Sequence, residues 1–185
     1  MMESYRPIFS EEKDFYGSME YNYLFQDLPI EFQKALKENR YITARDLKKM
    51  LKRLFPNTKF SVRTRKYAGG SSVDIQYKDG VALEKVEKVV DWDTKDFNGM
   101  YDISLSTRYK VLMPDMTIRK IEFDWYGYVS VRREYSKEAI EQAIEELGLE
   151  NYATAENYYD GTGYVNTNDF RVSEKIYNYL RHKDI

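Results

Sequence analysis

The sequence predicts an α+β fold, with an antiparallel sheet of about five strands and helices packed on one face. Three observations support this class. Stretches with helical apolar spacing alternate with stretches whose apolar residues recur at every second position. Glycine-containing turns separate the predicted strands. The length of 185 residues is enough to bury a core without disulfides, and the chain has no cysteine.

The chain begins with an aromatic-rich leader and a short helix, which together make up residues 1–39. We expect this part to form one unit and residues 40–185 to form a single α+β domain. Thr43 is a typical N-cap, and Asp46 three residues later completes an acidic form of the capping box. The helix that follows ends at Pro56.

From residue 60 the apolar period falls to two, which predicts a hairpin. The glycines Gly69 and Gly70 supply the turn, and Asp79-Gly80 ends the second strand before a helix over residues 81–90. The apolar residues that alternate with polar ones are Phe60, Val62 and Thr64 in the first strand and Val73, Ile75 and Tyr77 in the second.

Alternation predicts three more strands, over residues 103–109, 119–125 and 128–133. Ser136 is the N-cap of a helix that ends at Gly148, and Asp169 is the N-cap of the last helix. Residues 152–165, between these two helices, form an aromatic loop or an irregular strand pair.

Cations are concentrated between residues 40 and 66, where ten of them accompany one carboxylate, in a chain whose net charge is −2. Such segregation is typical of a surface that meets phosphates or an acidic partner. The alternative is a solvated helix face balanced by acids elsewhere in the fold. The candidate binding residues lie on the helix after Thr43 and on the hairpin: Arg45, Lys48, Lys49, Lys52, Arg53, Arg63, Arg65, Lys66 and Tyr67.

Tyrosine side chains add a second signal. Tyr67, at the hairpin turn, is placed to stack on a base, and Tyr126 and Tyr128 at the later turn are candidates for stacking or for a protein interface. An acidic helix near the C-terminus would instead suit a positively charged channel on a partner. Its carboxylates are Glu138, Glu141, Glu145 and Glu146.

No set of residues has the pattern of a catalytic site, so the sequence favours a binding protein without a cofactor. The carboxylates Asp91, Asp93 and Asp96 are candidates for Mg²⁺, but the calcium-loop pattern fails because Lys95 occupies its fifth position. A small metal-dependent nuclease that uses these three residues stays an alternative. No apolar run approaches the length of about 20 residues that crosses a bilayer, and no signal peptide is expected, which favours the cytoplasm of a bacterial host.

Two motifs carry a family resemblance. The first motif is Tyr67-Ala68-Gly69-Gly70-Ser71-Ser72. It is preceded by Phe60-Ser61-Val62-Arg63 and followed by Val73-Asp74-Ile75 and Asp79-Gly80. The second motif is Phe97-Asn98-Gly99-Met100-Tyr101-Asp102. Together they resemble the large polyvalent protein associated domain numbered 29 over roughly residues 44–110. This module is found in polyproteins and small proteins of phages and conjugative elements. The resemblance implies a mobile-element origin and brings no catalytic residue with it.

Small proteins of phages and integrated elements frequently oppose host defence, so the resemblance implies, by analogy, an anti-CRISPR or other anti-restriction protein. Such a protein would inhibit a type II CRISPR effector nuclease by binding the effector, its guide RNA or its DNA channel. The expected partners are therefore the host effector, its guide RNA and nucleic acid bound directly, with no membrane. The alternative is a non-catalytic nucleic-acid-binding accessory module that acts in replication, packaging or transfer.

Overall fold

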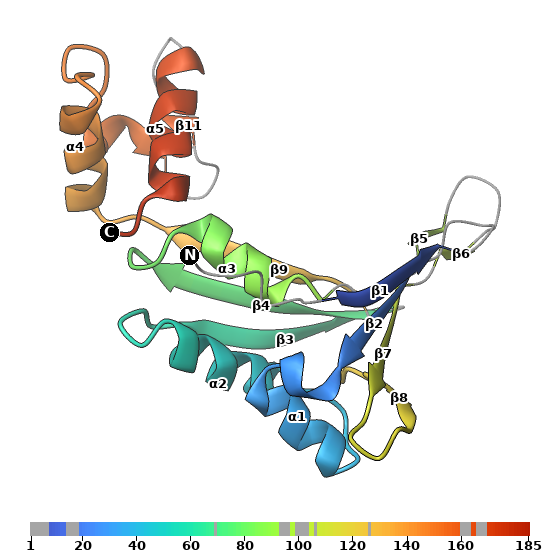
Figure 1. Ribbon diagram of the computed structural model, residues 1–185. Helices are drawn as coiled ribbons and strands as arrows, with labels where there is room; N and C mark the ends of the chain where they lie inside the picture. Colours follow the sequence, from blue (N-terminus) through green and yellow to red (C-terminus); the bar gives the residue numbers. More distant parts are fainter. Residues whose placement is uncertain are drawn as a thin grey trace.

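The computed structural model describes residues 8–13, 19–68, 70–92, 97–98, 104–105, 107–125, 127–159, 164–165 and 170–185. Helices and strands are interspersed along these residues, which confirms the α+β class (Figure 1). The strands do not form one antiparallel sheet of about five strands. They form a four-stranded and a three-stranded sheet, both of them mixed, and two short strand pairs.

The four-stranded sheet has the order β1-β2-β7-β8, and its strands are β1 (Ile8–Lys13), β2 (Met19–Leu24), β7 (Thr107–Leu112) and β8 (Ile118–Lys120). β2 pairs with β7 in parallel, and the other two pairs are antiparallel. β8 is shorter than the strand predicted over residues 119–125, because the chain leaves the sheet and Phe123 instead makes a bridge to Ile42.

The three-stranded sheet has the order β3-β4-β9, and its strands are β3 (Ser61–Tyr67), β4 (Gly70–Lys78) and β9 (Val129–Glu134). β3 and β4 form the predicted antiparallel hairpin, whereas β9 joins β4 in parallel. The two short pairs join β5 (Phe97–Asn98) to β6 (Ser104–Leu105) and β10 (Tyr158–Tyr159) to β11 (Tyr164–Val165).

The helices of the described residues are α1 (Ile30–Lys37), α2 (Ala44–Leu54), α3 (Leu83–Val90), α4 (Lys137–Glu146) and α5 (Phe170–His182). Two 3-10 turns accompany them, Phe25–Asp27 and Ala155–Asn157. Ser136 caps α4 as predicted, because its hydroxyl accepts a hydrogen bond from the Ala139 amide. The predicted cap of α5, Asp169, lies outside the described residues.

One large core joins both main sheets to the first three helices. Val73 and Ile75 of β4, Val86 of α3 and Met50 of α2 are fully buried in it. β2 and α1, from the predicted leader, contribute Tyr23 and Phe32 to the same core.

A second, smaller core lies between α4 and α5, which stand together at one end of the molecule (Figure 1). Arg133 of β9 ties this end to the hairpin. Only 6% of its surface is exposed, and its guanidinium donates hydrogen bonds to the carbonyls of Asp79, Gly80, Leu180 and Lys183.

Candidate nucleic-acid interface

The predicted capping box fixes the start of α2. The Thr43 hydroxyl accepts a hydrogen bond from the Asp46 amide, and the Asp46 carboxylate accepts one from the Thr43 amide at 3.0 Å. The Thr43 amide gains a partner in this way, and the Asp46 amide, which also donates to the Thr43 carbonyl at 2.9 Å, gains a second one. The first turn of α2, from which the basic side chains begin, therefore has a defined position.

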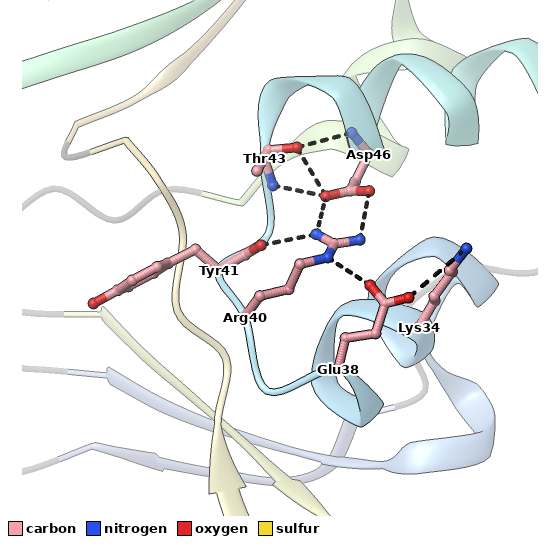
Figure 2. Close-up of polar contacts among 6 residues, drawn as sticks. All are labelled: Lys34, Glu38, Arg40, Tyr41, Thr43 and Asp46. Carbon is pink, nitrogen blue, oxygen red and sulfur yellow. Dashed lines mark hydrogen bonds and ion pairs between the residues drawn. The ribbon is translucent and has the colours of Figure 1, made fainter.

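Arg40 belongs to this cap and not to the exposed basic surface. Figure 2 shows its guanidinium between two carboxylates. The two terminal nitrogens donate hydrogen bonds to Asp46 at 2.7 and 3.1 Å, and Nε donates one to Glu38 at 2.8 Å. The guanidinium also donates to the Tyr41 carbonyl. Arg40 is half-buried, and the charge of this one of the ten cations is paired with two carboxylates of the protein itself.

The cap makes a prediction about acid stability. Burial alone would raise the pKa of Asp46, but hydrogen bonds from Arg40 and Thr43 outweigh it and hold the pKa below its usual value of about 4. The stabilisation by Asp46 is therefore fully present above about pH 4 and is lost as the pH falls through the lower, folded-state pKa. Asp46→Asn is expected to cost about 2 kcal/mol at neutral pH and to flatten the stability profile below pH 4, as measured by urea denaturation.

The matched control for this prediction is Asp115→Asn. The pKa of Asp115 is lowered by hydrogen bonds from Thr117 within an exposed turn, and burial has little effect on this pKa. We expect this variant to stay within about 0.5 kcal/mol of the parent protein. Equal losses in the two variants would show that the Arg40–Asp46 pair adds no stability beyond that of a local turn.

α2 gathers five of the predicted binding residues on its solvent side, as its helical period requires. All five are exposed: Arg45, Lys48, Lys49, Lys52 and Arg53. Arg53 is held by Glu31 of α1 through two hydrogen bonds of 2.8 and 2.9 Å. Within the described residues no ion pair involves the other four, so their charge is available to a ligand. We call these five residues the α2 stripe.

The hairpin places its predicted residues elsewhere. Val62 packs against the core beside α2, so the alternation of β3 directs Arg63, Arg65 and Tyr67 to the opposite face of the sheet. Arg65 pairs with Asp74 at 2.9 Å. Eight of the nine predicted binding residues thus lie on two surfaces, the α2 stripe and the far face of the hairpin.

Lys66 alternates with these residues and lies on the α2 side of β3. Its charge acts on Asp124: burial raises the pKa of that carboxyl, and the nearby Lys66 opposes the shift.

Comparison with known proteins assigns the family. Residues 39–136 match large polyvalent protein associated domain 29, which is more than half of the chain. The protein belongs to this family. The match extends beyond the predicted region of residues 44–110 and takes in α2, the hairpin, α3 and β9. No curated protein and no solved structure matches the chain.

The domain 29 match ends at residue 136, so the pair α4 and α5 lies outside it. The carboxylates predicted as an acidic surface on α4 are partly neutralised there. Lys183 pairs with Glu146 at 2.6 Å, and Lys137 lies 3.7 Å from Glu141. Hydrogen bonds from Lys183, Tyr179 and Gln142 lower the pKa of Glu146 to about 2.

The predicted metal ligands of the domain 29 region are described only in part. Asp91 ends α3, whereas Asp93 and Asp96 lie outside the described residues. Across the portion of the chain that is described, no group of three or more histidines and carboxylates could hold a metal ion. The same portion contains no helix that is both long and apolar enough to cross a membrane.

Sequence reasoning missed one cation of the domain 29 sheet. Arg132 of β9 lies opposite Gln76 of β4 in the parallel register, on the same face as Arg63 and Arg65. Alternation in β9 could have identified Arg132 as a residue of the polar face. The register that brings it beside the hairpin joins strands more than 50 residues apart, and no local pattern records it.

Proposed function

We propose that this protein is a non-catalytic nucleic-acid-binding module of a mobile genetic element, and that the α2 stripe binds the phosphate backbone. The observation that carries the proposal is the set of four cations on the stripe that make no ion pair within the described residues. Lysine and arginine on one face of a helix attract phosphates regardless of base sequence. The family's occurrence in phages and conjugative elements, implied by its motifs, supports a setting in which nucleic acid is handled.

The spacing of the stripe suits a phosphate chain. From Arg45 to Lys52 the helix rises by about 10 Å. Successive phosphates of one DNA strand advance by about 3.4 Å along the duplex axis, so the stripe spans about three such intervals and can meet about four phosphates. α2 also keeps its position without the ligand, because the capping box and the Arg53–Glu31 pair hold its two ends.

The anti-defence role is a narrower form of the same proposal. In that form the nucleic acid is the guide RNA or the target DNA of a type II CRISPR effector nuclease, and binding blocks recognition or cleavage. It rests on the analogy with small phage proteins that oppose host defence. Cleavage by the purified effector, measured with and without this protein, tests it: unchanged cleavage at saturating protein would remove the anti-defence form.

The main test is charge reversal on the stripe. Lys48→Glu, Lys49→Glu and Lys52→Glu together are expected to weaken binding to labelled duplex DNA and to guide RNA by about 100-fold at low salt. Four phosphate contacts predict a slope of about −3.6 for the logarithm of the affinity for duplex DNA against that of the salt concentration. The variant keeps only Arg45 of the four cations and should bring the slope to about −0.9. Fluorescence anisotropy at several salt concentrations measures both quantities.

A control variant changes the net charge equally at other exposed lysines, Lys37, Lys120 and Lys175. It should bind nearly as tightly as the parent protein. If both triple variants lose affinity equally, only net charge matters and the stripe is not a site. If the stripe variant loses nucleic-acid binding but still inhibits the effector, the protein acts on the effector through another surface.

A further inference from the structure

The three-stranded sheet has one face that its core does not occupy. Val73, Ile75 and Tyr77 of β4 point into the core with α2 and α3, so alternation places their neighbours on the opposite side. The registers with β3 and β9 then identify the residues of this open sheet face. They are Ser61, Arg63, Arg65 and Tyr67 on β3, Asp74, Gln76 and Lys78 on β4, and Tyr128, Ser130, Arg132 and Glu134 on or beside β9. Ser72 of β4 has the same orientation but is buried.

The charge of this face is opposite in sign to that of the whole chain. It carries four cations against two carboxylates, whereas the net charge of the protein is −2. Three arginines of the face are exposed. Arg63 and Arg65 lie on β3, at one side of the central strand β4, and Arg132 lies on β9, at the other side. Asp74 is the carboxylate between them, and it pairs with Arg65, whose side chain is still 73% exposed.

Two tyrosines complete the face at its hairpin end. Tyr67 is 46% exposed and Tyr128 is 44% exposed. Tyr67 lies opposite Gly70, which has no side chain to hold it away from the sheet. Its hydroxyl reaches as far as Gly127, where an added Cβ would meet it at 2.9 Å. The Tyr67 side chain therefore extends over β4 to the residue that precedes Tyr128.

We infer that the open sheet face binds single-stranded nucleic acid, with Tyr67 and Tyr128 stacking on bases and Arg63, Arg65 and Arg132 contacting phosphates. Exposed aromatic rings beside cations on a sheet are suited to unpaired bases, because every base has a π face on which a ring can stack. The bases of a duplex already stack on one another and are not available to these rings. The face thus discriminates in favour of a single strand.

This site goes beyond the phosphate-binding role of the α2 stripe. α2 packs on the core side of the sheet, and the tyrosines lie on the other side, so the two surfaces bind independently. A substitution can abolish binding at one surface and leave binding at the other unchanged. The α2 stripe is expected to bind duplex and single strand through charge alone, whereas the open sheet face adds preference for the single strand.

The test compares leucine and phenylalanine at the two tyrosines. Tyr67→Leu with Tyr128→Leu is expected to lower the affinity for a short labelled oligothymidylate by about tenfold or more, with the salt slope unchanged. Tyr67→Phe with Tyr128→Phe keeps both rings and should bind within about twofold of the parent protein. Circular dichroism and thermal melting check that each variant is folded.

A second variant avoids any disturbance of the turn. Arg63→Gln with Arg132→Gln changes two exposed side chains. It should reduce the magnitude of the salt slope for oligothymidylate by about 1.4, while duplex binding changes little. The leucine and phenylalanine variants should still differ when the α2 stripe is also reversed. That result separates this site from the stripe.

Three outcomes would overturn the inference. The parent protein could show no affinity for oligothymidylate, the leucine variant could bind as well as the phenylalanine variant, or the arginine variant could keep the parent salt slope. If the face variants retain oligothymidylate binding but lose binding to an effector protein, the face docks an acidic protein surface instead. None of these results would bear on duplex binding by the α2 stripe.

Discussion

Trp92→Ala is expected to lower the free energy of unfolding by about 4 kcal/mol, which is a large part of the stability of a typical domain. The indole is 1% exposed. It lies within 5.0 to 6.0 Å, between ring centroids, of Tyr23 in β2, Phe32 in α1, Tyr109 in β7 and Phe123. Removing it leaves a cavity where elements of the four-stranded sheet meet α1, and these rigid elements cannot collapse to fill it.

Urea denaturation followed by circular dichroism measures the loss. Tyr152→Ala is the control, because this ring is 67% exposed and its removal should cost less than about 0.5 kcal/mol. Trp92→Phe keeps an aromatic ring and should recover more than half of the stability. If Trp92→Ala unfolds at the same urea concentration as the control, the aromatic cluster does not stabilise the packing of the four-stranded sheet against α1.

The elements that sequence reasoning predicted well have signals within a few residues. The capping box at Thr43 and Asp46 places the start of α2, and Pro56 follows its end. Gly148, with φ of 63°, stands just beyond α4 as predicted. Period-two alternation predicts both strands of the hairpin because, from Val73 onward, buried residues of β4 alternate with half-buried or exposed ones.

Sheet organisation could not be predicted in the same way. The parallel pairs β2-β7 and β4-β9 join distant segments, and a parallel pair requires a crossover whose partner strand is not marked in the sequence. The sequence places the residues of β2 in an aromatic-rich leader without a clear period, because Tyr21 and Tyr23 are recognisable as strand residues only when β7 lies beside them. The prediction of a single antiparallel sheet is wrong, because both main sheets contain a parallel pair.

In the candidate site too, local sequence patterns place some of the residues, and the others depend on contacts between distant parts of the chain. The helical period was sufficient to place Arg45, Lys48 and Lys52 on one side of α2. It could not show that Arg40 is paired with Asp46. An arginine and an aspartate that pair within the fold look the same in a sequence as ones that are exposed on the surface. The helical period also could not place Arg132 beside Arg63, since that proximity depends on the β4-β9 register.

The second large effect is expected at Arg133. Arg133→Met should lower the free energy of unfolding by about 3 to 5 kcal/mol, because it leaves four carbonyl groups without their charged donor. The side chain also lies against the rings of Tyr77 and Tyr135, at 6.0 and 4.9 Å from their centroids. Arg132→Ala, one position along β9 and exposed, is the matched control and should change stability by less than about 0.5 kcal/mol.

The position of Arg133 predicts how the variant unfolds as well as how much it loses. Its carbonyl partners come from both the β4–α3 turn, at Gly80, and the C-terminal segment, at Leu180 and Lys183. A further pair of backbone hydrogen bonds joins Gly80 to Ile185. Without the guanidinium, the amides of α5 should therefore exchange with solvent before those of β4, as hydrogen exchange can measure. Uniform exchange across both segments would instead mean that the two cores unfold as one and that Arg133 is not the link between them.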